Sequence, residues 1–167
     1  MVLPPYFYIN MQQIKATLNV TKEVKNTIVS EIDKRHYAML DNSSTDRFDL
    51  FNIALAIGLC EDIPTPLSVH ESFVRTERLT EDILSRYRAI YYAKVLAPNL
   101  RPIDEIVDTN AILELIEQYA NTGFIKLKEL MEQYDEDTFM FKMLSDATTI
   151  YYKDFIMTGV VADEELY

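Results

Sequence analysis

The chain has 167 residues, of which 49% are hydrophobic and 26% are charged, so it can bury a core as a single domain. Three Gly and no Trp argue against Gly-rich phosphate loops and turn-rich β-sandwiches, and the single Cys excludes an internal disulfide and a Cys-based zinc site. A formal net charge of −11 argues against bulk affinity for nucleic acid, because such affinity requires many phosphates to be neutralised.

The same features predict a cytoplasmic protein. Free cysteine suits a reducing compartment, and the N-terminus lacks the basic and apolar regions of a signal peptide. The sequence has no apolar run of about 18 residues, so we expect no membrane span.

Residues 1–20 predict an extended arm and a strand. Leu3-Pro4-Pro5 disfavours a helix, because proline lacks a backbone N–H and restricts the residue before it. From Gln13 to Val20, apolar and polar residues alternate, which is the period-two pattern of a half-buried strand.

A helix is predicted directly after this strand. Thr21 is a suitable N-cap, and Val24, Ile28 and Ile32 recur on one helical face, so we expect an amphipathic helix over Lys22–Arg35. A strand followed by a helix is how ribbon-helix-helix proteins begin, and in those dimers the paired strands enter the DNA major groove.

Further helices are predicted from apolar spacing and capping residues. Asp46 caps an apolar helix that Gly58 ends, and a loop over residues 59–75 contains a short strand at Leu67–Phe73. The later helices are expected from Thr76 or Thr80 to Pro98, from Asp108 or Thr109 to Gly123, from Phe124 to Tyr134 and from Phe139 to Phe155.

The segment Ile112–Met131 carries two apolar stripes, one on each side of Asn121-Thr122-Gly123. Gly adopts the left-handed backbone that commonly ends a helix, so we expect a helix, a tight corner and another helix here. In all, the sequence predicts a compact, mainly α domain with a short N-terminal strand that a homodimer could pair. Its regions are an extended arm and strand (1–20), a helical domain (21–155) and an acidic tail (156–167).

No catalytic or metal-binding motif is found. His36 and His70 are separated by a predicted helix and a loop, and neither a P-loop nor a nucleophile-elbow pattern occurs. The acid pairs on the predicted helices, including Glu114 and Glu117, are typical of solvated faces. We therefore expect no enzymatic activity, no metal and no cofactor.

Charge is unevenly distributed along the chain. Between Arg75 and Arg101 there are six bases and three acids, whereas from Glu129 onward there are ten acids and two bases. The arginines could contact phosphates, but we favour a surface helix whose arginines pair with the acidic C-terminal third. The candidate DNA contacts are four outward positions of the first strand, Gln13, Lys15, Thr17 and Asn19, and four arginines, Arg75, Arg78, Arg86 and Arg88.

Aromatic residues are abundant, which is typical of partner surfaces. The candidate partner surface comprises two Tyr pairs and one acidic turn: Tyr91, Tyr92, Tyr151, Tyr152, Asp135, Glu136 and Asp137.

Two stretches carry a family resemblance. One is the strand and helix over residues 13–35 with the apolar helix that ends at Gly58. The other is Glu117-Gln118-Tyr119-Ala120-Asn121-Thr122-Gly123-Phe124, followed by Leu127 and Leu130. Over residues 13–134 the chain resembles small accessory proteins of bacterial Dnd-type DNA phosphorothioation and restriction loci.

The resemblance implies a non-catalytic accessory subunit of an anti-phage defence complex that works beside a larger nuclease or ATPase subunit. It transfers no catalytic residue, because the motifs are structural. Two alternatives from other classes stay open. One is a ribbon-helix-helix-like DNA-binding regulator, and the other is an acidic inhibitor of the DNA-mimic or immunity type.

Overall fold

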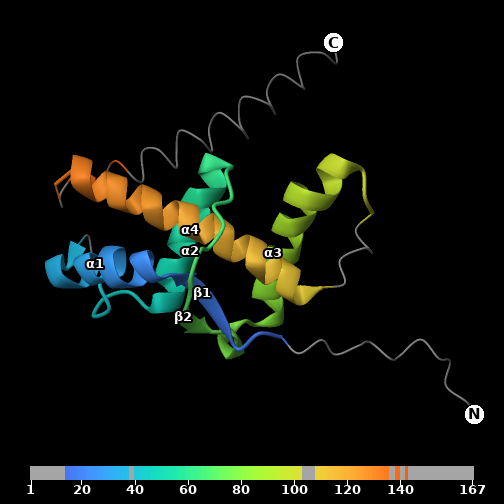
Figure 1. Ribbon diagram of the computed structural model, residues 1–167, viewed down its shortest axis with the longest axis horizontal. Coiled ribbons are helices and arrows are strands. Elements are labelled where there is room, and N and C mark those ends of the chain that lie inside the picture. The colour runs from blue at the N-terminus through green and yellow to red at the C-terminus, as the bar shows by residue number, and fades with distance from the viewer. Residues whose placement is uncertain (1–13, 38–39, 103–107, 136–137, 140–141, 143–167) are drawn as a thin grey trace, which may run out of the picture.

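The computed structural model describes residues 14–37, 40–102, 108–135, 138–139 and 142. As predicted, the fold is mainly helical with a short two-stranded sheet near the N-terminus (Figure 1). Its main elements are β1 (Thr17–Thr21), α1 (Ser30–Arg35), α2 (Arg47–Glu61), β2 (His70–Arg75), α3 (Glu81–Tyr91) and α4 (Thr109–Gln133). The predicted arm, acidic tail and most of the last predicted helix lie outside the described residues.

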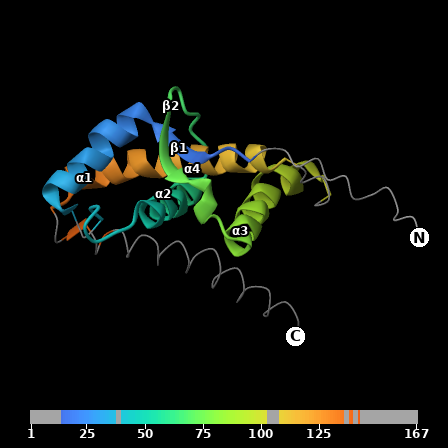
Figure 2. The same cartoon turned by 90° about the horizontal axis from the view of Figure 1, so that it is seen from below.

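Helix α4 is the element against which α2, α3 and β1 all pack. In Figure 2 it runs across most of the coloured ribbon, with α2 and α3 below it. Its core face is lined by large apolar side chains, and Leu113, Ile116, Phe124 and Leu127 are fully buried. The placement of α2, α3 and β1 is therefore defined relative to α4.

The predicted first strand is confirmed from Thr17 onward, and it pairs with β2 of its own chain. Residues 14–16 precede the strand, and Ile14 and Ala16 are exposed, so the predicted start at Gln13 is not observed. The pair is antiparallel, with Leu18 opposite Val74 and a register irregularity after Leu18. Leu18 and Val20 are buried while the alternate positions are half-exposed, as the period-two pattern indicates. The strand–helix order of a ribbon-helix-helix start is thus present, whereas the observed partner of β1 is an intrachain strand.

The amphipathic helix after β1 is also confirmed. Residues 22–35 are helical throughout, with a π-helical segment, η2 (Val24–Val29), before α1. The Thr21 hydroxyl accepts a hydrogen bond from the backbone N–H of Val24, so Thr21 acts as the expected cap. The helix ends at His36, whose φ of 50° lies in the left-handed region.

Helix α2 begins as predicted and ends later than predicted. The Asp46 carboxylate accepts the backbone N–H of Phe48 at 2.8 Å, which confirms the cap. The expected stop at Gly58 is wrong, because the helix continues to Glu61 and closes at Asp62, where φ is 56°. Gly58 is buried inside the helix.

The region between α2 and α4 follows the prediction with shifted boundaries. Strand β2 spans His70–Arg75, and a separate 3-10 turn, η4 (Thr76–Arg78), precedes α3. Thr80 caps α3 through its hydroxyl. The helical run continues through η5 (Tyr92–Leu96) and η6 (Ala97–Asn99).

The predicted corner at Gly123 is wrong, since α4 is unbroken from Thr109 to Gln133. Gly123 instead lies where the backbone of α4 closely approaches the backbone of α2. A Cβ placed on Gly123 would lie 1.7 Å from the backbone oxygen of Ala54. One placed on Gly58 would lie 1.8 Å from the backbone oxygen of Tyr119. The backbones of α2 and α4 therefore touch at this crossing, which only glycine permits.

Aromatic rings extend this crossing toward the sheet. The Phe73 ring of β2 meets the Phe124 ring of α4 edge to face, with centroids 5.7 Å apart. Phe51 of α2 lies on the other side of Phe73, at 6.5 Å. The arrangement joins α2, α4 and β2 in one core, because each element contributes one ring.

The contact at the glycine crossing predicts that Gly123→Ala destabilises the protein, whereas helix propensity alone predicts that it stabilises the protein. In an ordinary helix, Gly123→Ala would stabilise the protein by about 1 kcal/mol. Here the added methyl meets the rigid Ala54 carbonyl, so we expect a net loss of about 1–3 kcal/mol in the free energy of unfolding, measured by urea denaturation.

The matched control is Ala56→Gly, at an exposed position of α2, which should cost about 1 kcal/mol through propensity alone. A Gly123→Ala variant that is as stable as the wild type, or more stable, contradicts the close-approach account.

Candidate functional site

The candidate DNA contacts on β1 are occupied within the chain. The ammonium of Lys15 lies 2.7 Å from the Glu117 carboxylate of α4. The Thr17 hydroxyl lies 3.0 Å from the Asn19 side-chain oxygen and 3.2 Å from the Ser72 hydroxyl of β2. Gln13 lies outside the described residues. The structure thus places Lys15, Thr17 and Asn19 together, on a surface bounded by β2 and α4.

Glu117 is a site residue that the sequence analysis misassigned. We expected Glu117 and Glu114 to lie on a solvated face, but Glu117 is only 1% exposed while Glu114 is exposed. The carboxylate also accepts the backbone N–H of Asn19 at 2.6 Å. Burial raises the pKa of the Glu117 carboxyl, and the hydrogen bond and charge of Lys15 oppose that rise.

Three of the four candidate arginines pair with acids between residues 46 and 82. Their predicted pairing with the acidic C-terminal third stays a prediction, because most of that third lies outside the described residues. Arg75 is exposed at the end of β2. The observed ion pairs are Arg78–Asp46 at 2.6 Å, Arg86–Asp82 at 2.7 Å and Arg88–Glu81 at 2.5 Å.

The candidate partner surface is not brought together by the described residues. Tyr91 and Tyr92 are half-buried, and Tyr91 packs against the core. Asp135 is exposed, and its carboxylate accepts the backbone N–H of Thr138 at 2.9 Å. Hydrogen bonding with Thr138 lowers the pKa of the Asp135 carboxyl. Glu136, Asp137, Tyr151 and Tyr152 lie outside the described residues.

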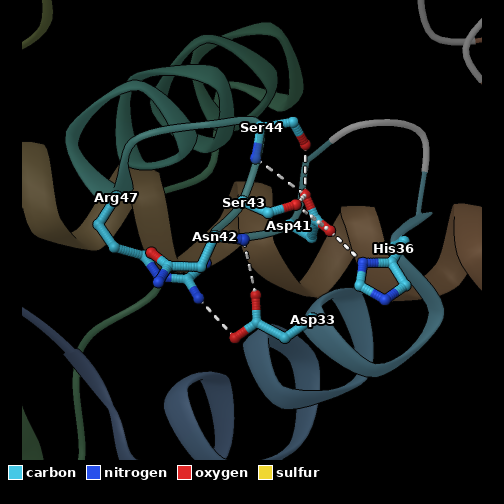
Figure 3. A network of polar contacts seen from close by, with 7 residues as sticks. All are labelled: Asp33, His36, Asp41, Asn42, Ser43, Ser44 and Arg47. Carbon is cyan, nitrogen blue, oxygen red and sulfur yellow. Dashed lines mark hydrogen bonds and ion pairs between the residues drawn. The ribbon is translucent and has the colours of Figure 1, made fainter.

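The densest polar network surrounds Asp41, in the loop between α1 and α2 (Figure 3). Asp41 is 3% exposed and accepts hydrogen bonds from the hydroxyls of Ser43 and Ser44. The oxygen Oδ2, which accepts from Ser43, also contacts Nδ1 of His36. In a catalytic triad the imidazole stands between the hydroxyl and the carboxylate. Here the carboxylate stands between them, so the arrangement holds the loop and does not activate a serine.

The same network ties α1 to the start of α2. The Asp33 carboxylate accepts the backbone N–H of Asn42 at 3.0 Å and pairs with Arg47 at 2.5 Å. Hydrogen bonds from Ser44, His36 and Ser43, in that order of effect, hold the pKa of the Asp41 carboxyl well below its usual range. This cluster therefore explains the polar loop after α1 as a structural clamp.

A second feature is the attachment to α4 of the predicted loop that follows α2, and this attachment had no sequence signal. Residues 63–69, which we call the 63–69 loop, lie along α4 and are held there by two side chains. Thr122 Oγ1 lies 2.6 Å from the Ile63 carbonyl oxygen and accepts the backbone N–H of Thr65 at 3.1 Å. The Asn121 amide donates to the Thr65 carbonyl at 3.3 Å.

A pocket opens beside this loop. It lies between η2, the 63–69 loop and α4, has a volume of about 250 Å³, and we call it the Asn121 pocket. The side-chain oxygen of Asn121 is buried and has no hydrogen-bond partner in the part of the chain that the structure describes. Three exposed apolar residues lie on the loop and the adjacent face of α4: Ile63 at 64%, Val69 at 53% and Ile125 at 42% exposure.

Among the described residues, no group of three or more His, Cys, Asp or Glu side chains is arranged to hold a metal ion. No helix within the same ranges combines the length and apolar character needed to cross a bilayer.

Comparison with known proteins adds no family assignment. No family model, curated protein or solved structure matches the chain.

The ion pair between Lys15 and Glu117 predicts that removal of the Lys15 side chain lowers stability. A role of Lys15 in DNA contact alone would not predict this loss. Lys15→Ala leaves a buried carboxylate without its cation, so we expect a loss of about 3 kcal/mol at neutral pH, measured by urea denaturation. The folded-state pKa of Glu117 is raised, so protonation relieves the penalty and the gap to the wild type narrows as the pH falls.

Lys25→Ala is the control, because it removes an exposed ion pair, Lys25–Glu71, with a separation of 3.7 Å. The loss of this pair should lower the free energy of unfolding by less than about 1 kcal/mol. Equal stability of the two variants, or a gap for Lys15→Ala that does not change with pH, would contradict the assignment.

The Asp41 clamp predicts an acid-sensitive contribution to stability. Because folding lowers the pKa of Asp41, its stabilisation is fully present above the unfolded value of about 3.9 and is lost as the pH falls toward the folded value. Asp41→Asn should therefore be less stable than the wild type at neutral pH, and the difference should shrink below about pH 4. Urea midpoints measured across this range test it, with Glu114→Gln as an exposed control. A pH-independent difference would count against the clamp.

Proposed function

We propose that the protein is a non-catalytic accessory subunit that docks a larger protein. The observation that carries this proposal is that the exposed side chains of Val69, on the 63–69 loop, and Ile125, on α4, both line the Asn121 pocket. Exposed apolar residues usually occur singly, whereas a group beside a pocket with polar groups is typical of an interaction surface.

The larger partner is proposed to belong to a bacterial anti-phage defence complex, on the basis of the resemblance to accessory proteins of Dnd-type loci. Four of the residues that carry this resemblance support the fold. Glu117 holds β1, Asn121 and Thr122 hold the 63–69 loop, and Gly123 receives α2. A signature made of such contacts favours a scaffold that presents a surface.

The DNA-binding alternative is less well supported by the contacts. Lys15 and three of the four candidate arginines are engaged with acids of the same chain, so phosphate binding would have to break those pairs. The alternative of an acidic inhibitor depends on the acidic C-terminal third, most of which lies outside the described residues.

The test is purification of the tagged, full-length protein from its own cells at native expression, followed by native mass spectrometry. We expect a larger protein in fixed stoichiometry that remains bound at about 500 mM salt, because apolar contacts are not screened. The control is an unrelated acidic protein carrying the same tag.

Recovery of the 19.4 kDa chain alone would overturn the docking proposal. A shift of duplex DNA by the purified chain at about 150 mM salt would instead favour the DNA-binding alternative, because a chain of this acidity has little non-specific affinity for DNA.

A further inference from the structure

We propose that the Asn121 pocket binds an extended peptide segment of the larger partner. An aliphatic side chain of that segment enters the pocket, and a backbone N–H of the segment donates to the side-chain oxygen of Asn121. This inference rests on the proposed function and names the chemistry of its contact.

Asn121 supplies the first reason. Its side chain is buried, with the residue 3% exposed, and its oxygen has no partner among the described residues. Rotating the amide by half a turn does not help, because the oxygen would then face the Thr65 carbonyl, which is also an acceptor. Buried polar atoms in native proteins nearly always have a partner, and none of the described residues supplies one here, so we assign the donor to the bound segment.

The walls of the pocket indicate what accompanies that donor. They include the apolar side chains of Val24, Ile28, Pro66, Val69 and Ile125. The volume of about 250 Å³ exceeds the 150 Å³ cavity that holds a benzene molecule and falls below the range of about 300–1,000 Å³ for drug-sized ligands. A single large aliphatic side chain with its backbone amide fits these limits.

The mouth of the pocket argues against an anionic ligand. Lys22 and Glu23 stand next to each other on the lining and carry opposite charges, and Thr21 and Ser68 are neutral. A phosphate or nucleic-acid strand would meet no excess of positive charge there. A neutral peptide backbone has the required N–H donor, and the exposed side chains of Val69 and Ile125 extend the apolar contact beyond one residue.

The experiment uses the full-length chain and a displayed library of random 12-residue peptides. We expect the selected peptides to share an aliphatic residue. Their affinity, measured by fluorescence polarisation, should fall at least tenfold in Val69→Asp and in Ile125→Asp. Leu100→Asp is the matched control, because Leu100 is 94% exposed and does not line the pocket, and it should leave the affinity unchanged.

The Asn121 contact is tested from the peptide side, so that the protein fold is not disturbed. A selected peptide is made in versions that each carry one N-methylated backbone amide, which lacks its N–H. Methylation of the amide that donates to Asn121 should weaken binding about tenfold, since it leaves the Asn121 oxygen buried and unpaired. The same affinity at every position would mean that water alone occupies that oxygen, and would overturn the proposal.

The remaining outcomes separate this inference from the proposed function. Failure to select any peptide, or full binding by Val69→Asp, overturns the pocket as a peptide site. If a larger partner still co-purifies with Val69→Asp, docking stands but occurs elsewhere. If sedimentation velocity shows a dimer that Val69→Asp abolishes, the occupant is a second copy of this chain and the partner-peptide proposal is contradicted.

Discussion

The contact on which the rest of the structure depends is the crossing of α2 and α4 at Gly58 and Gly123. A side chain at either glycine would lie within 2 Å of the opposite backbone, so the two helices approach as closely as their main chains allow. This approach brings Phe51 and Phe124 into one core with Phe73 of β2. The long helix α4 can then serve as the reference for α3 and β1, because its position relative to α2 is fixed by backbone contact.

Away from this crossing, α4 organises the chain through polar side chains. Glu117 receives a backbone N–H of β1 and the ammonium of Lys15, while Thr122 and Asn121 hold the 63–69 loop. A buried acid and a buried amide on one helix would be costly without these partners. The side-chain oxygen of Asn121 is the exception, because no described residue donates a hydrogen bond to it. This oxygen lies beside exposed apolar side chains, and the proposed docking function would supply its missing donor.

Local patterns predicted much of this fold from the sequence, whereas contacts between distant segments could not be predicted. The alternation before Thr21, the cap at Asp46 and the stripe of Val24, Ile28 and Ile32 are local signals, and the structure confirms them. Gly123 was misinterpreted because glycine serves helix ends and close helix crossings alike, and only the position of Ala54 distinguishes the two. Glu117 was misassigned because its cation, Lys15, lies just before β1, far away in sequence. The Asn121 pocket had no sequence signal, because it forms between three elements.

The most direct test of the central claim is amide hydrogen exchange along α4, resolved residue by residue. If the helix is unbroken and Gly123 lies against α2, the amides of residues 121–127 should be as strongly protected as those one turn earlier, since each donates to a carbonyl four residues before it. Rapid exchange over residues 122–127, with protection on both sides, would show a corner at Gly123 and would contradict the account.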